Sequence, residues 1–230
     1  MIRAAGVLLL HLLLLLTAAC TQAERAREAA NAPATAATPG TSTAAATRPR
    51  IVALGDSLTA GLGLTPDEAY PALLQQRLDR EGLRYEVVNA GVSGETSAGG
   101  LRRVDWALEG DVKVLIVALG GNDALRGLPV EQLRDNLSEI IARAERRGIA
   151  VILAGMEAPP NFGAAYTAAF RQTYRDVAKD HDVVLLPFLL DGVAGLPHMN
   201  QTDGIHPTAA GAQRVADNIW SALRPIVKPE

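Results

Sequence analysis

Residues 51–58 read Ile51-Val52-Ala53-Leu54-Gly55-Asp56-Ser57-Leu58, and this stretch decides the fold class. Four consecutive apolar residues closed by a glycine are typical of a strand that is covered on both faces. Polar residues come directly after the glycine. In an open parallel sheet, ligands bind beyond the carboxyl ends of the strands. The residues directly after each apolar run of the chain are therefore the candidates for chemistry.

Four further apolar runs are predicted to be strands, at residues 85–88, 112–119, 150–154 and 183–186. Between them, apolar residues recur three and four positions apart, which indicates amphipathic helices. The apolar faces are Tyr70, Leu73, Leu74 and Leu78; Leu133, Leu137, Ile140, Ile141 and Ala144, closed by Gly148; Phe170, Tyr174, Val177 and Ala178; and Ala212, Val215, Ile219 and Leu223. Residues 98–109 form a weaker helical pattern. This alternation predicts an α/β fold, a three-layer α/β/α sandwich with a central parallel five-stranded sheet of flavodoxin-like character.

The first 20 residues resemble a secretory signal peptide. Arg3 precedes an apolar run, Val7 to Leu16, that is too short to span a membrane comfortably. Small residues and the chain's one cysteine, Cys20, come next. This pattern resembles the lipobox of bacterial lipoproteins, although Thr17 stands where Leu is usual. We therefore expect an exported protein at the periplasmic or cell-envelope face, anchored to a membrane through a lipidated Cys20. Ordinary cleavage nearby, which would release a soluble protein, is the alternative.

Composition predicts the limits of the folded domain and excludes several kinds of partner and site. Residues 21–49 contain no apolar residue larger than Ala and are predicted to be a flexible tether. Residues 50–230 then form one folded domain. Lys plus Arg number 22 and Asp plus Glu 25, a net charge of -3, which argues against nucleic acid held by bulk positive charge. A single cysteine excludes a disulfide framework within the chain and a four-cysteine zinc site.

Polar or glycine-rich blocks come after four of the predicted strands. They are Gly55-Asp56-Ser57-Leu58, Asn89-Ala90-Gly91-Val92-Ser93-Gly94-Glu95-Thr96, Gly120-Gly121-Asn122-Asp123 and Asp203-Gly204-Ile205-His206-Pro207. A serine, a glycine-rich turn, an asparagine and an Asp/His pair at one sheet edge are the components of nucleophilic acyl transfer. In this order the blocks resemble the GDSL or SGNH hydrolase family, in the branch of bacterial thioesterase I, lysophospholipase L1 and arylesterases. The resemblance extends from about Ile51 to Leu223.

The candidate catalytic residues are Ser57 as nucleophile, His206 as general base and Asp203 as the acid that orients the base. His206 is preferred over the other histidines because Asp203 lies three residues before it, close enough to hold the imidazole N–H. Asp56 is a rival for the acid. Adjacent side chains generally point apart, however, so Asp56 is assigned to bracing the turn that carries Ser57. Asp123 is expected to make structural hydrogen bonds.

The resemblance implies an oxyanion hole made by the backbone N–H groups of Ser57 and Gly94 and by the Asn122 side-chain amide. Glycine at position 94 would let the backbone approach a substrate closely. Loops beside the site supply candidate pocket residues. These are Leu125, Met156 and Phe162. Neither a metal cluster nor a phosphate-binding loop motif appears in the sequence, so no cofactor and no metal are expected.

The predicted function is therefore that of a monomeric serine esterase. It would hydrolyse carboxylic esters of the lysophospholipid, aryl ester or acyl thioester type through an acyl-enzyme on Ser57. Its partners would be a small-molecule or lipid ester and a membrane, with no nucleic acid. Two alternatives stay open, a carbohydrate O-deacetylase of the cell envelope and a catalytically silent envelope-binding lipoprotein.

Overall fold

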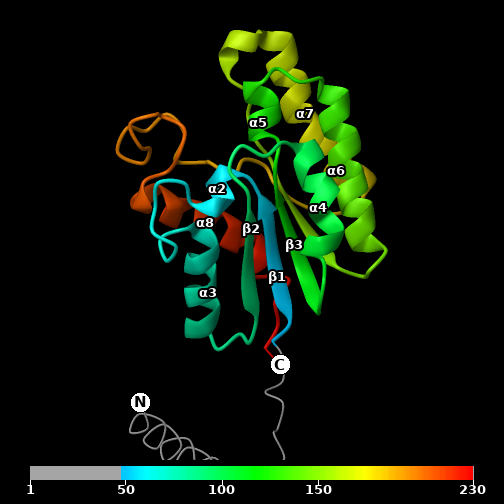
Figure 1. The fold of residues 1–230 in the computed structure, drawn as a ribbon, viewed down its shortest axis with the longest axis vertical. Helices are drawn as coiled ribbons and strands as arrows, with labels where there is room; N and C mark the ends of the chain where they lie inside the picture. Colours follow the sequence, from blue (N-terminus) through cyan, green and yellow to red (C-terminus); the bar gives the residue numbers. More distant parts are fainter. Residues whose placement is uncertain (1–47, 230) are drawn as a thin grey trace, which may run out of the picture. The chain divides into compact units, whose positions relative to one another are not determined.

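The computed structural model describes residues 48–229. The predictions of a signal peptide at 1–20 and of lipidation at Cys20 fall outside the described residues, as does the tether predicted over 21–49 except for its last two residues. At that end the prediction is wrong for Pro49, which is buried and accepts a hydrogen bond from Glu86 N at 2.9 Å. Within them, five strands form one parallel sheet in the order β2-β1-β3-β4-β5 (Figure 1). The strands are β1 (Arg50–Gly55), β2 (Glu86–Gly91), β3 (Val112–Ala118), β4 (Ala150–Ala154) and β5 (Val184–Leu186). All five predicted strands are thus present.

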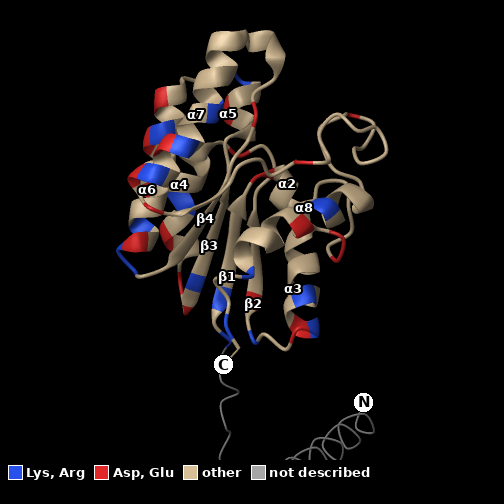
Figure 2. Cartoon of the chain, turned by 180° about the vertical axis from the view of Figure 1, so that it is seen from behind, with Lys and Arg blue, Asp and Glu red and all other residues tan. Residues whose placement is uncertain are grey.

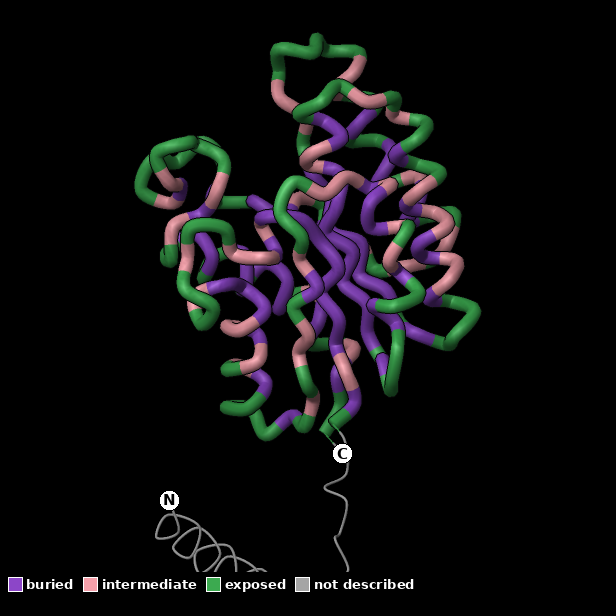
Figure 3. The backbone as a smooth tube through the Cα atoms, in the orientation of Figure 1, coloured by how far each residue is buried: buried purple, intermediate pink, exposed green. Residues whose placement is uncertain are grey.

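Burial depends on the position of each strand in the sheet. The apolar residues Ile51–Leu54 of β1 are buried, since β1 is paired on both sides and helices cover its two faces. The β3 and β4 runs are buried in the same way (Figure 3). The expectation of complete burial is wrong for β2 and β5, most of whose residues are half-buried or exposed. These strands lie at the two edges of the sheet, and each has only one neighbouring strand.

Helices cover both faces of the sheet. On one face lie α3 (Tyr70–Arg80) and α8 (Ala209–Leu223), which pack side by side. On the other lie α4 (Ser97–Ala107), α6 (Val130–Glu145) and α7 (Ala164–Asp180) (Figures 1 and 2). The three-layer α/β/α prediction is confirmed. Figure 2 shows charged residues gathered on the exposed sides of these helices, as amphipathic helices require.

The helix faces predicted from periodicity are the ones that pack on the sheet. The buried residues of α6 are Leu133, Leu137, Ile140, Ile141 and Ala144. Its end is closed by hydrogen bonds from Gly148 N to Glu145 O (2.9 Å) and from Ile149 N to Ala144 O (3.1 Å), as predicted for Gly148. No helix among residues 48–229 combines the length and apolarity that a membrane crossing needs.

Three short helices complete the fold, and two of them position the site. They are α2 (Ser57–Ala60), α5 (Gly121–Leu125) and the 3₁₀ turn η1 (Pro160–Phe162). Helix α2 begins two residues after β1 ends, and α5 begins three residues after β3 ends. The register pairs Gly55 with both Gly91 and Ala118, so the carboxyl ends of β1, β2 and β3 lie level. The polar blocks after these strands therefore meet at one edge of the sheet.

Candidate active site

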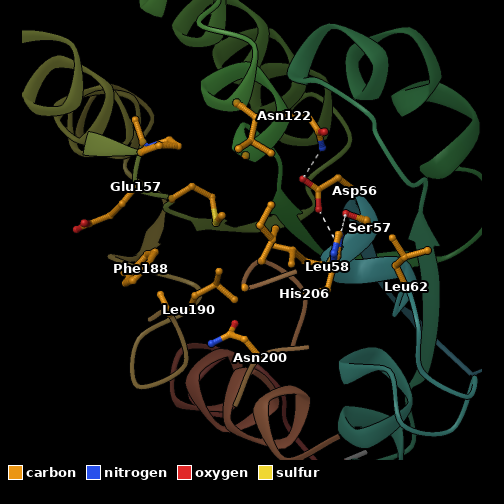
Figure 4. A pocket seen from close by; sticks show the side chains of 18 of the residues that line it. Asp56, Ser57, Leu58, Leu62, Asn122, Glu157, Phe188, Leu190, Asn200 and His206 are labelled. Atoms are coloured by element: carbon orange, nitrogen blue, oxygen red, sulfur yellow. Dashed lines mark hydrogen bonds between the residues drawn. The ribbon is translucent and has the colours of Figure 1, made fainter. Parts of the chain in front are cut away.

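Ser57 is the first residue of α2, where β1 turns into helix. The carboxylate of Asp56 caps this helix, because its Oδ1 accepts a hydrogen bond from Leu58 N at 3.0 Å. Ser57 is largely buried, and its Oγ lies 2.9 Å from Nε2 of His206 (Figure 4). The turn thus presents the serine hydroxyl to the imidazole, and Asp56 braces the turn as predicted.

His206 and Asp203 lie together in the loop before α8. His206 Nδ1 lies 2.6 Å from Asp203 Oδ2, while Asp203 Oδ1 accepts hydrogen bonds from the backbone N–H groups of Ile205 (2.9 Å) and His206 (3.0 Å). The pKa of Asp203 is lowered to about 2, mainly by the hydrogen bond to the His206 ring and to a smaller extent by the two backbone hydrogen bonds. An ionised carboxylate beside Nδ1 keeps the ring proton on that nitrogen. Nε2 is then free to accept the proton of the Ser57 hydroxyl.

Three hydrogen-bond donors belong to residues that line the same cavity as the Ser57 hydroxyl. Asn122, in the first turn of α5, donates through Nδ2 to Asp56 Oδ2 at 3.1 Å, which leaves its second amide hydrogen available (Figure 4). Gly94 has a backbone φ of 80°, a conformation that residues other than glycine rarely adopt. Within residues 48–229, the backbone N–H groups of Ser57 and Gly94 donate no hydrogen bond. All three residues line one cavity, as an oxyanion site requires.

Two buried carboxylates support this arrangement without joining the histidine. Burial raises the pKa of Asp56 to about 6, although its hydrogen bonds to Leu58 N and Asn122 partly oppose the rise. Asp123 accepts hydrogen bonds from Ser97 N (2.8 Å) and Ser97 Oγ (2.6 Å), which ties α5 to the start of α4. Asp123 thus makes the structural hydrogen bonds that were predicted for it.

A cavity of about 750 Å³ opens beside the Ser57 hydroxyl. Its apolar lining includes Leu58, Leu62, Leu125, Met156, Phe188 and Leu190. The pocket predictions for Leu125 and Met156 agree with this lining. Phe162 does not line the cavity, because η1 turns its ring toward Tyr166, with ring centroids 5.4 Å apart. The lining residues Leu58, Leu62, Phe188 and Leu190 were not predicted. Phe188 and Leu190 come soon after β5 and lie at the edge where the site was expected.

The described residues offer little to hold a metal ion. Across residues 48–229, no group of three or more His, Cys, Asp or Glu side chains converges in a way that could bind one. Glu157 lines the cavity but is paired with Arg171, at 3.0 Å. Asp203 binds His206, and His206 in turn binds Ser57. Asp203, His206 and Ser57, joined by hydrogen bonds, are the groups that acyl transfer to a serine requires.

Comparison with known proteins agrees with this chemistry. The model of the GDSL-like lipase/acylhydrolase family matches residues 53–214. Esterase TesA of Pseudomonas aeruginosa is 44% identical over 178 residues, which are 77% of this chain and 89% of that protein. The Escherichia coli protein named thioesterase 1/protease 1/lysophospholipase L1 is 37% identical over 184 residues, 80% of this chain and 87% of that protein.

Solved structures give the same result. The crystal structure of TesA matches with a TM-score of 0.75 at 44% identity and covers 77% of this chain and 99% of its own. The psychrotrophic esterase EstA from Pseudoalteromonas sp. matches with a TM-score of 0.73 at 32% identity, covering 76% and 97%. The matched region 53–214 contains Ser57, Gly94, Asn122, Asp203 and His206. The chain belongs to the GDSL-like lipase/acylhydrolase family and is an ester hydrolase.

Proposed function

We propose that this protein is an exported serine esterase that acts, as a monomer, on carboxylic esters with an apolar acyl chain. The observation that carries the proposal is the chain of hydrogen bonds from Asp203 through His206 to Ser57, at 2.6 and 2.9 Å, beside a cavity with an apolar lining. A serine hydroxyl is a weak nucleophile until a base takes its proton, and this geometry supplies the base.

The reaction has two halves. Ser57 Oγ attacks the ester carbonyl carbon while His206 Nε2 takes the hydroxyl proton, and the carbonyl oxygen becomes an oxyanion. The N–H groups of Ser57, Gly94 and Asn122 stabilise that oxyanion. The C–O bond to the leaving alcohol then breaks as His206 returns the proton to it. Water attacks the acyl-enzyme by the same steps, which releases the acid and restores Ser57. No cofactor enters either half.

The cavity favours an acyl chain longer than acetyl. A volume of about 750 Å³ lined by leucine, phenylalanine and methionine side chains removes apolar surface from water, and a longer chain gains about 0.8 kcal/mol for each buried CH₂ group. An acetyl group would leave most of this surface uncovered. The cavity thus favours lysophospholipids, aryl esters or acyl thioesters over the sugar acetates of an O-deacetylase.

Hydrolysis of p-nitrophenyl esters from acetyl to palmitoyl tests the proposal, with wild type compared with Ser57→Ala and His206→Ala. We expect turnover with an optimum above acetyl, and loss of at least about 10³-fold in kcat in both variants. Equal activity in wild type and Ser57→Ala would overturn the assignment of the nucleophile. No activity of wild type on the whole panel would favour the silent envelope-binding alternative, and an acetyl optimum would favour the O-deacetylase.

The location of the protein is part of the proposal. It is supported by the apolar run before Cys20 and by the small residues that separate them. Lipidation of Cys20 would attach the domain to a membrane without spanning it. Fractionation of cells that produce wild type or Cys20→Ser tests this. Release of Cys20→Ser from the membrane fraction supports the anchor, whereas equal pelleting of the two proteins contradicts it.

A further inference from the structure

Two arginines contact the loop that carries Gly94, one from α4 and one from the residue after α5. Arg103, on α4, donates from Nε to both carboxylate oxygens of Glu95, at 2.9 and 2.7 Å, and its Nη2 also reaches this carboxylate. Arg126, directly after α5, donates from Nη2 to the carbonyl oxygen of Gly94 at 2.7 Å. The acyl-transfer chemistry described above uses neither arginine.

Arg103 connects the Gly94 loop to the end of β1, the strand that precedes Ser57. Besides binding Glu95, its Nη2 donates to the carbonyl oxygen of Gly55 at 3.1 Å. The same carbonyl accepts a hydrogen bond from Val92 N at 3.0 Å. A single guanidinium therefore links the residue after Gly94 with the residue two before Ser57. The fork of the arginine head can hold both partners at once, whereas a lysine ammonium has no such fork.

The Glu95–Arg103 ion pair is mostly buried by the residues around it. The Glu95 and Arg103 side chains are only 11% and 17% exposed. The glycine at position 99 leaves the space that Glu95 occupies, since a Cβ there would lie 2.4 Å from Glu95 Cγ. Arg103 Nη1 is buried and has no hydrogen-bond partner among residues 48–229. A buried ion pair with one unpaired nitrogen adds little to the free energy of unfolding, because the cost of removing both charges from water offsets their mutual attraction. The pair is better explained by the positions it fixes, since Arg103 holds Glu95 and Gly55 at a set separation.

Arg126 connects the same loop to the third donor. Asn122 lies in α5, and the residue after that helix is Arg126. The bond from Arg126 to the Gly94 carbonyl therefore fixes Gly94 relative to the helix that carries Asn122. The three donors belong to three separate segments of the chain, and the two arginines join these segments in pairs.

We propose that Arg103 and Arg126 are positioning residues that hold the Gly94 N–H in register with the Ser57 N–H and the Asn122 amide. This inference rests on the proposed function, because it assigns those three groups to the oxyanion. Oxyanion stabilisation depends on donors fixed before the reaction begins. A Gly94 loop that moves by a fraction of an ångström should weaken the transition state and leave substrate binding in the cavity nearly unchanged.

The test compares Arg103→Lys, the double variant Arg103→Gln/Glu95→Gln, and Arg126→Gln with wild type. Arg143→Lys is the matched control, since Arg143 also binds two carboxylates, Asp105 and Glu139, on the helix layer. A neutral p-nitrophenyl ester gives kcat and KM, a trifluoromethyl ketone gives transition-state-analogue affinity, and thermal unfolding gives Tm. The double variant removes both charges of the pair, so neither is left buried alone.

We expect kcat to fall about tenfold in each arginine variant, below the roughly 10²–10³-fold loss of a whole donor, because the donor is displaced and not removed. KM should stay within about twofold, and ketone affinity should fall in parallel with kcat/KM. The Arg143→Lys control should match wild type. The double variant, which leaves no buried charge, should have a Tm no lower than that of Arg103→Lys, but its kcat should stay about tenfold below wild type.

Three outcomes would overturn the inference. Wild-type kcat in Arg103→Lys, or recovery of kcat together with Tm in the double variant, would make the pair merely structural. An increase in KM for a lysophospholipid in Arg126→Gln, with normal kcat on the neutral ester, would make Arg126 a substrate-binding residue. The proposed function fails separately, and takes the inference with it, if Ser57→Ala retains wild-type activity in the same assay.

Discussion

Replacing Asp56 with Asn should disable the oxyanion site through Asn122. The two oxygens of Asp56 accept separate hydrogen bonds, from Leu58 N and from Asn122 Nδ2. An asparagine has one oxygen, and if this oxygen keeps the bond to Leu58 N, its NH₂ group faces the NH₂ group of Asn122. The Asn122 amide then turns over to accept the bond. Its oxygen replaces the N–H that would face the substrate, and kcat should fall by roughly 10²–10³ with KM nearly unchanged.

The same substitution should change how stability depends on pH. Burial raises the pKa of Asp56 from 3.8 to about 6, so the folded protein binds its proton more tightly than the unfolded chain does. The stability that this proton contributes is complete below the unfolded pKa and is lost as pH rises through the folded pKa. A shift of about two units corresponds to about 3 kcal/mol. The introduced amide does not titrate. The free energy of unfolding of Asp56→Asn, relative to wild type, should therefore rise by about 3 kcal/mol between about pH 3 and pH 7.

Kinetics at pH 8 and urea unfolding across this pH range measure the two effects. The decisive comparison adds Asn122→Ala and the double variant. If Asp56 acts on the reaction through Asn122, the double variant should be no slower than Asn122→Ala alone. Fully additive losses, or wild-type kcat in Asp56→Asn, would refute the coupling. An unfolding free-energy difference that is flat with pH would refute the burial argument.

Three further results are expected. Asp203→Asn should lower kcat at pH 7 by about 10⁴-fold, because the Asp203 carboxylate, with its pKa lowered to about 2, is ionised there and holds the His206 ring proton on Nδ1. Wild-type kcat in this variant would contradict the orienting role of Asp203. Ala194→Trp, at an exposed position that lines the cavity, should shift the chain-length optimum to shorter esters. The same change at Ala168, exposed on α7 outside the cavity lining, should leave the optimum unchanged. Treatment with EDTA should leave kcat unaltered, whereas loss of activity that added metal restores would contradict a metal-free reaction.

Local patterns were sufficient to predict most of the fold. The burial of β3 and the inward face of α6 could be predicted from runs and spacings within one segment. The end of β2 could not be predicted from such patterns. The predicted strand stopped at Val88, but β2 continues to Gly91 because Leu54 and Gly55 pair with Ala90 and Gly91. Pairing partners far apart in sequence decide where such an edge strand ends, and no local pattern records them.

The cavity lining also divides into residues that local sequence predicts and residues whose direction depends on packing. Leu125 lies three residues after Asn122, and its place in the lining could be predicted from that proximity. Phe162 lies in an equally suitable loop, but its ring turns to Tyr166. The direction of a side chain in a single 3₁₀ turn depends on what packs against that turn. Sequence spacing does not contain that information.

The two halves of the site differ in how they are held, and this difference explains what the sequence could predict. Asp203 fixes His206 within one short loop, by bonds to its ring and to two backbone N–H groups, so a three-residue spacing was enough to identify the pair. The oxyanion donors come from segments after three different strands, and side chains such as Arg103, 48 residues from Gly55, hold them together. The Asp203–His206 loop depends on few contacts outside itself, so distant substitutions should leave it unchanged. The three oxyanion donors depend on long-range contacts, so a distant substitution can displace them. Substitutions remote from the substrate should therefore act on this enzyme mainly by lowering kcat through the oxyanion site, with the proton transfer by His206 preserved.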